Sequence, residues 1–174
     1  MRIGYLECFA GISGDMLMGA LVDAGAPVEL LQRTAASLAL GAELRVSKVS
    51  RSGIQATKID VVVQDRVHEP AAATGPVERH HHPHPHDHEH EHTHEHDHKH
   101  EHGRSLPEIR ALLSTADLTQ RAHELSLRAF SLLARAEGRI HGVPWEEVHF
   151  HEVGAIDAIV DIACCAAAAD ALGV

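Results

Sequence analysis

The stretch LRVSKVSRSGIQATKIDVVV, Leu44–Val63, decides the fold class of this 174-residue chain. Two runs rich in β-branched residues flank Ser50–Gly53, whose serines and glycine are typical of a turn, so the pattern predicts an antiparallel β-hairpin. In the second run alternate residues favour a buried face, and these are Thr57, Ile59, Val61 and Val63. The opposite face carries Lys58 and Asp60, and we expect that face to meet water.

The residues before the hairpin predict one strand and two helices. Ile3–Cys8 has the composition of a short strand and leads into a glycine-containing turn. A helix then begins after Ser13, a favourable N-cap residue, and ends at Gly25. A second helix is expected from Pro27, which suits a first helical turn, to Gly41.

The C-terminal part of the sequence predicts three further helices. Ser105 and Glu108 form the S-x-x-E pattern of a capping box, which marks the start of the first. Asp117 is expected to cap the second and longest helix, which ends at Gly142. Its predicted apolar face consists of Leu118, Ala122, Leu125, Ala129, Leu132, Ala136 and Ile140. The third helix follows Gly154, and its many alanines imply close packing and burial.

These elements predict a mixed α/β (α+β) fold, in which a small sheet with a β-hairpin is packed by several helices. We expect residues 1–67 to form an N-terminal βααββ half and residues 104–174 to form a helical half of the same domain. Residues 68–103 lie between them. A segment of this length without apolar periodicity predicts a disordered His-rich metal-binding linker.

Charge and composition argue against several classes of function. The net charge is −10 at pH 7, and nucleic-acid binding needs clustered Lys and Arg, which this chain lacks. The longest uncharged apolar run near the end, Ile162–Ala169, is far shorter than the ~20 residues that cross a bilayer. Cys8, Cys164 and Cys165 do not resemble a disulfide framework, so we expect a reduced, cytoplasmic setting in which they are apolar fillers.

A histidine tract gives the strongest single signal of function. Between His80 and His102 the chain has 13 of its 18 histidines, interleaved with acidic residues. Imidazole suits Ni, Zn, Cu and Co ions, and overlapping ligand sets favour binding on the order of two to six ions. A pH-sensitive spacer and a purification tag are the alternatives to metal binding. The candidate ligands are His80, His81, His82, His84, His86, His88, His90, His92, His94, His96, His98, His100 and His102.

A second group of candidate residues follows the long helix. His149 and His151 point to one side of an extended chain, and Glu152 follows them. Asp157 and Asp161, four residues apart, share one face of a helix. Two imidazoles with two or three carboxylates are consistent with a divalent-metal site. The alternative is that Asp157 only serves the helix N-terminus and the histidines are ordinary loop residues.

A third candidate is the glycine-containing turn Glu7–Asp15. A turn between a strand and a helix can present backbone N–H groups to an anion. The sequence has neither the G-K-[ST] of a phosphate-binding P-loop nor the G-x-G-x-x-G of a dinucleotide site. A tight turn with Asp15 as a favourable charge at the helix start is the competing interpretation.

Three features together resemble the LarC family of nickel insertion proteins. The first is ECFAGISGDM, Glu7–Met16, and the second is HFHEVGAIDAIVDI, His149–Ile162. The third is the internal His-rich linker. They occur in the family's order and cover nearly the whole chain.

The resemblance implies a nickel chelatase, or cyclometallase, of the lyase class. Such an enzyme inserts Ni(II) into pyridinium-3,5-bisthiocarboxylic acid mononucleotide, the nickel-free pincer mononucleotide, and forms Ni–S bonds and a Ni–C bond. CTP and Mn(II) or Mg(II) are implied as cofactors, and a lactate racemase-type enzyme as the recipient of the product. The motif residues that we assign to catalysis are Asp15, His149, His151, Glu152, Asp157 and Asp161, with His149 and His151 also as metal ligands.

The chain departs from the family pattern in its length. Family members are much longer, and we expect their C-terminal domain, associated with nucleotide binding, to be absent here and to act as a partner domain or chain. The 174 residues are then expected to hold the nickel-loading half. A non-catalytic nickel or zinc storage protein, or a metallochaperone, is the alternative function.

Overall fold

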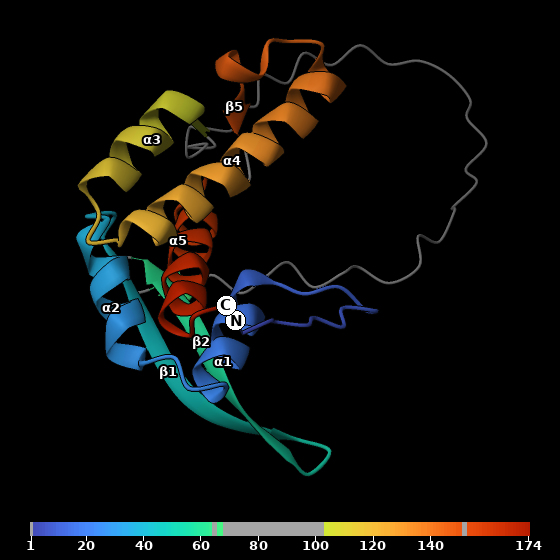
Figure 1. Ribbon diagram of the computed structural model, residues 1–174, viewed down its shortest axis with the longest axis vertical. Helices are drawn as coiled ribbons and strands as arrows, with labels where there is room; N and C mark the ends of the chain where they lie inside the picture. The colour runs from blue at the N-terminus through green and yellow to red at the C-terminus, as the bar shows by residue number, and fades with distance from the viewer. Residues whose placement is uncertain (1, 64–65, 68–102, 151–152) are drawn as a thin grey trace, which may run out of the picture.

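The computed structural model describes residues 2–63, 66–67, 103–150 and 153–174. Its elements confirm a mixed α/β fold with a small antiparallel sheet β1-β2-β3, a second ladder β4-β5 and helices packed around them (Figure 1). No helix in these ranges is long and apolar enough to cross a membrane. The elements are α1 (Gly14–Asp23), α2 (Val28–Ser37), β1 (Ala42–Arg51), β2 (Ile54–Val63), β3 (Arg66–Val67), β4 (Arg104–Ser105), α3 (Leu106–Thr115), α4 (Gln120–His141), the 3-10 turn η1 (Trp145–Glu147), β5 (His149–Phe150) and α5 (Ile156–Ala171).

The predicted hairpin is confirmed. Strands β1 and β2 pair in antiparallel register from Ala42 opposite Val63 to Arg51 opposite Ile54. Two residues alone, Ser52 and Gly53, make the turn, with φ of 50° and 80°. Positive φ at both positions is what a right-twisted hairpin with a two-residue loop requires, and this explains the glycine.

The two faces of β2 are less different than expected. Thr57, Ile59, Val61 and Val63 are all buried, as predicted. The expectation that Asp60 meets water is wrong, because this residue is only 9% exposed. Its Oδ1 lies 2.7 Å from Nζ of Lys58, and a carboxylate at this depth needs such a partner.

Asp23 joins the end of α1 to the hairpin. Its carboxylate accepts hydrogen bonds from the backbone N–H and the hydroxyl of Thr57 at 2.7 and 2.6 Å, and from Lys48 Nζ at 2.8 Å. These donors, Lys48 first, hold the pKa of Asp23 well below its usual range. Gly19 lies against the carbonyl of Thr57, so a glycine on α1 lets this helix approach β2 closely. The position of α1 relative to the sheet is therefore fixed at two points.

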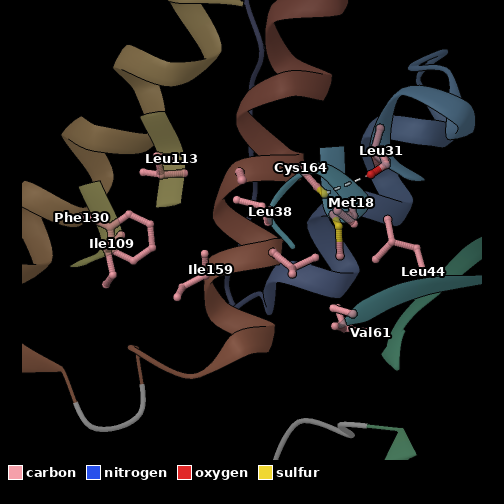
Figure 2. Packing of buried hydrophobic residues seen from close by; sticks show 14 of the residues in the cluster. Met18, Leu31, Leu38, Leu44, Val61, Ile109, Leu113, Phe130, Ile159 and Cys164 are labelled. Atoms are coloured by element: carbon pink, nitrogen blue, oxygen red, sulfur yellow. Dashed lines mark hydrogen bonds between the residues drawn. The ribbon is translucent and has the colours of Figure 1, made fainter. Parts of the chain in front are cut away.

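Helix α5 forms the centre of the core. Ile159 and Cys164 on this helix are fully buried, and both lie in one apolar cluster with residues from either end of the chain (Figure 2). Leu31 of α2 packs on one side of α5, and Phe130 of α4 packs on the other. The first 63 residues and the residues after 103 therefore share a single apolar core.

Helix α4 differs from its prediction at its start and on its buried face. Its N-cap is Thr119, whose hydroxyl accepts from the N–H of Ala122, and not Asp117. Leu132 and Ile140 were expected inside but are 60% and 80% exposed. The face that is buried consists of Ala122, Ser126, Phe130, Ala134 and Gly138. Small residues on this face allow α4 to approach the alanine-rich α5, and this close packing outweighs the burial of larger side chains elsewhere on the helix.

The predicted strand Ile3–Cys8 does not form. Residues 2–12, here called the N-terminal arm, are extended and exposed, with Tyr5 81% and Phe9 94% exposed (Figure 1). One backbone hydrogen bond is recorded within the arm, from Gly11 N–H to Cys8 O at 3.0 Å. A strand needs a paired strand for its backbone groups, and no described strand pairs with the arm.

Helix α2 is shorter than the sequence predicts. Helix α2 ends at Ser37, four residues before the expected Gly41, and a left-handed residue, Ala39 with φ 53°, follows it. Of the predicted linker 68–103, residues 68–102 lie outside the described residues.

Candidate functional site

The first turn of α1 meets the middle of α5. A β-carbon on Gly14 would overlap the carboxylate of Asp161, so α1 reaches this side chain only because residue 14 is glycine. The preceding residue, Ser13, is the N-cap of α1, but its side chain makes no capping hydrogen bond. The two motifs Glu7–Met16 and His149–Ile162 are therefore in direct contact, although they lie at opposite ends of the sequence.

Helical spacing places three polar side chains of α5 on one face. Asp157 is in the first turn, Asp161 follows one turn later, and Cys165 one turn after that. On α1, Asp15 is in the first turn, where a carboxylate is stabilised by the helix dipole. The structure brings Asp15, Asp157 and Asp161 close enough for their charges to interact.

Burial and like charge together perturb Asp161. Burial of its carboxyl group raises the pKa to about 7, and the neighbouring charges of Asp15 and then Asp157 add to this increase. Oδ1 of Asp161 lacks a donor that would offset this, since it is buried without a hydrogen-bond partner in the described part of the chain. Asp161 is thus a carboxyl group that gains and loses its proton near neutral pH.

A second orphaned oxygen belongs to the residue before Gly14. The Ser13 hydroxyl is buried and has no hydrogen-bond partner within the described ranges. Buried polar atoms almost always have a hydrogen-bond partner. Two buried oxygens without one, at residues 13 and 161, therefore call for a functional explanation. Ser13 and Asp161 each retain the capacity to bind a further polar group.

Cys165 belongs to this group of side chains and was not predicted as a site residue. Its Sγ lies 3.7 Å from the Gly14 carbonyl oxygen. Burial, with the charges of Asp161 and Asp15, raises the pKa of the Cys165 thiol to about 12, so the thiol is protonated at neutral pH. The i, i+4, i+8 spacing from Asp157 is the signal in the sequence that indicates this position.

The other two cysteines have different surroundings. Cys164 is fully buried, and its thiol donates to the Leu31 carbonyl at 3.4 Å, in agreement with its interpretation as an apolar filler. The same interpretation is wrong for Cys8, which is exposed on the N-terminal arm.

His149 lies on β5, and among the described residues it makes no recorded hydrogen bond or ion pair with the carboxylates of α5. It pairs with Ser105 in the β4-β5 ladder, and its side chain is exposed. Hydrogen bonds from Ser105 lower the pKa of Glu108, and the charge of His149 contributes further to this decrease. His151 and Glu152, the other predicted residues of this motif, lie outside the described residues.

Gly154, between β5 and α5, lies in close contact with the backbone of β4 and β5. A β-carbon there would stand 2.5 Å from the Phe150 carbonyl oxygen and 2.6 Å from the Arg104 nitrogen. The Arg104 side chain donates to the Gly154 carbonyl at 2.9 Å. The glycine is required by this close approach, and the contact fixes the start of α5 relative to β4.

The described residues limit whether this region can bind a metal ion or an anion. Among residues 2–63, 66–67, 103–150 and 153–174, no set of three or more His, Cys, Asp or Glu side chains is arranged to hold a metal ion. The N-terminus of α1, considered from sequence as an anion site, is faced by the carboxylate of Asp161. An external anion would meet that negative charge, so the structure favours the interpretation of Glu7–Asp15 as a tight turn.

Comparison with known proteins identifies the family. The profile of a family described as nickel insertion protein matches residues 4–174. A relative from Geobacillus kaustophilus, named pyridinium-3,5-bisthiocarboxylic acid mononucleotide nickel insertion protein, is 39% identical over 169 residues, which is 97% of this chain and 35% of the relative. One with the same name from Desulfitobacterium hafniense is 42% identical over 163 residues, covering 93% and 32% of the two chains.

A relative from Nostoc sp., named putative nickel insertion protein, is 45% identical over 175 residues, or 99% of this chain and 35% of the relative. The chain thus spans about a third of the length of the curated relatives it matches. No solved structure matches it. Because the family profile covers both motifs and nearly all residues between and beyond them, this chain belongs to the nickel insertion protein family.

Proposed function

We propose that this chain takes part in inserting nickel into pyridinium-3,5-bisthiocarboxylic acid mononucleotide, supplying nickel binding and part of the insertion site. The observation that carries the proposal is the contact between the two family motifs at Gly14 and Asp161. It gathers Asp15 and Asp157 around a carboxyl group whose pKa is raised to about 7. The relatives with this chemistry in their names match over this whole region.

The chemistry of insertion gives Asp161 a specific task. Forming a Ni–C bond to an aromatic ring releases the proton of the ring carbon, and this proton needs a base. A carboxylate whose conjugate acid has a pKa near the working pH is well suited to accept it. Burial keeps the pKa of Asp161 high, and the negative charges of Asp15 and Asp157 add to this, because both effects disfavour its ionised form.

Nickel itself is a substrate in this scheme. The histidine tract His80–His102 gathers Ni(II), and His149 and His151 receive it on its way to the sulfur atoms of the precursor. Imidazole ligands release nickel to thiocarboxylates without a change of oxidation state, because both ligand types bind the divalent ion.

The proposal includes the wider reaction implied by the family resemblance. The enzyme is a cytoplasmic nickel chelatase of the lyase class that uses CTP with Mn(II) or Mg(II), acts with a C-terminal partner domain or chain, and passes its product to a lactate racemase-type enzyme. The described residues do not assemble a site of three or more ligands for a resident divalent cation, so they do not fit that role.

Single substitutions in the complete protein test the site. In an anaerobic assay with the precursor, Ni(II) and CTP, we expect loss of insertion for Asp15→Asn, His149→Ala, His151→Ala, Glu152→Gln, Asp157→Asn and Asp161→Asn. Asp117→Asn, at an exposed carboxylate outside the group, is the matched control and should retain full activity. Full activity in all six site variants would show that the assignment is wrong.

The histidine tract itself favours one alternative, a non-catalytic nickel or zinc store or metallochaperone. Deleting residues 80–102 separates the two functions. For an insertion enzyme, we expect the deletion to reduce cofactor production at limiting nickel and to leave it nearly unchanged at excess nickel. If nickel binding disappears with the tract while cofactor production is unchanged in both conditions, the storage function is correct.

A further inference from the structure

A pocket of about 480 Å³ lies at the C-terminal end of α4, away from the group around Asp161. Its lining residues are Arg135, Gly138, Arg139, Val143, Pro144 and Trp145. Gly138 sets its shape, because a β-carbon there would stand 2.9 Å from the Val143 carbonyl oxygen and 3.3 Å from Trp145 Cα. The backbone of residues 143–145 therefore rests directly on α4 and holds Trp145 in place.

Trp145 positions two arginines from two different helices. The guanidinium of Arg110 on α3 lies 5.6 Å from the centre of the tryptophan ring, and that of Arg135 on α4 lies 5.2 Å from it. Cation–π contact holds a guanidinium by its face and leaves the N–H groups at its edge available. Arg135 and Arg139, one helical turn apart on α4, both line the pocket, whereas Arg110 contacts Trp145 without being one of the lining residues.

None of these three arginines has an ion pair or a hydrogen bond among the parts of the chain that the structure describes. The like charges of Arg135 and Arg139 at the pocket repel each other, and the repulsion is relieved when an anion binds between them. The chain as a whole has a net charge of −10, so this concentration of positive charge is a local feature. The pocket is large enough for a small organic anion and not for a folded partner.

We propose that Arg135 and Arg139 form a binding site for the phosphate group of a small phosphate monoester, with Trp145 as the platform that orients Arg135 in the pocket and Arg110 beside it. Planar guanidinium edges match the oxygens of a phosphate, and two or three of them neutralise its two negative charges. A mononucleotide as the source of the phosphate rests on the proposed function, whereas binding of free phosphate at this pocket does not. The phosphate has two sources that share this chemistry, a pyridinium mononucleotide and free inorganic phosphate.

The single tryptophan of the chain makes the test direct. Titration of the full chain with inorganic phosphate, and separately with nicotinate mononucleotide as a pyridinium phosphate monoester, is followed by Trp145 fluorescence and by calorimetry. Both probes should bind, and a mononucleotide site should bind the second at least about tenfold more tightly, since the ring adds contacts in the pocket. Equal affinity for the two probes would identify free phosphate as the source.

Variants on α4 then separate a built site from general charge attraction. Arg135→Gln should weaken phosphate binding by about tenfold or more, as expected for loss of a charge-assisted hydrogen bond. Arg128→Gln removes the same charge from the same helix outside the pocket, and should change the affinity by less than about twofold. Circular dichroism checks that both variants keep their helices.

Two results would overturn the proposal. The first is an equal loss of affinity in Arg135→Gln and Arg128→Gln, which would indicate diffuse attraction. The second is a response of Trp145 to a synthetic peptide of residues 86–101 and none to phosphate, which would make the ligand an acidic polypeptide.

Discussion

The absence of one methyl group at Gly14 allows the two family motifs to touch. In an exposed helix, replacing glycine with alanine raises the free energy of unfolding, and so stabilises the protein, by roughly 0.5–1 kcal/mol. Here we expect the opposite sign, because the new β-carbon would overlap the carboxylate of Asp161. Gly14→Ala should lower the free energy of unfolding by about 1–3 kcal/mol, the usual cost of overpacking. Urea unfolding followed by circular dichroism measures this change.

A double-mutant cycle with Asp161→Ala assigns the cost of that substitution. Shortening residue 161 makes room for the new methyl group, so Gly14→Ala should cost less in the Asp161→Ala background, with a coupling energy above about 0.5 kcal/mol. Identical costs in the two backgrounds would mean that the clash lies elsewhere.

The raised pKa of Asp161 makes the stability of the unliganded chain depend on pH. The folded state binds this proton with a pKa of about 7, and the unfolded state with the ordinary value of 3.8. Well below pH 3.8 the group is protonated in both states, and stability is lost as pH rises from about 3.8 through 7, by up to roughly 4 kcal/mol. Asp161→Asn should therefore flatten the decline between pH 4 and 7, measured as the free energy of unfolding in urea.

Asp117→Asn is the control for this pH profile, because Asp117 is exposed and lies outside the group around Asp161. Its decline with pH should match that of the unsubstituted chain. Parallel profiles for Asp161→Asn and the unsubstituted chain would contradict the assignment of the proton to Asp161.

At the scale of single elements, the sequence predicted what depends on neighbouring residues. The hairpin turn at Ser52-Gly53 and the capping box of Ser105 and Glu108 are both present. Each is a backbone requirement met within a few residues, so its signal is contained in the local sequence.

What the sequence did not predict depends on tertiary contacts. The buried face of α4 follows the small residues that fit against α5, and Leu132 remains outside although it is more apolar. The shared face of Asp157 and Asp161 could be inferred from helical spacing, whereas their meeting with Gly14 could not, because no local pattern encodes a contact between the two ends of a chain.

The N-terminal arm shows how an apolar segment can contribute little to stability. Phe9 is 94% exposed, and Phe130 is fully buried against Phe150, with ring centres 6.1 Å apart. Phe9→Ser should change the free energy of unfolding by less than about 0.5 kcal/mol, whereas Phe130→Ala should lower it by about 3–5 kcal/mol. Urea unfolding at one pH compares the two variants.

A large loss of stability in Phe9→Ser would show that the arm packs on the core in solution, in contrast to its exposed position. A small loss would leave Phe9, which lies in the family motif Glu7–Met16, without a role in holding this fold together.

At the scale of the whole molecule, the chain combines a small α/β core with a histidine tract, and the two parts predict separate nickel capacities. Loading by the tract requires neutral imidazoles, whose unperturbed pKa is about 6.5, so protons and nickel compete for the same nitrogens. We expect the full chain to bind on the order of two to six Ni(II) ions at pH 7.5 in equilibrium dialysis, and to lose most of them at pH 5.5. Deletion of residues 80–102 should remove this loading at both pH values while the helices, monitored by circular dichroism, are retained. Equal loading with and without the tract would place the nickel sites in the folded core, where the described residues offer no set of three ligands.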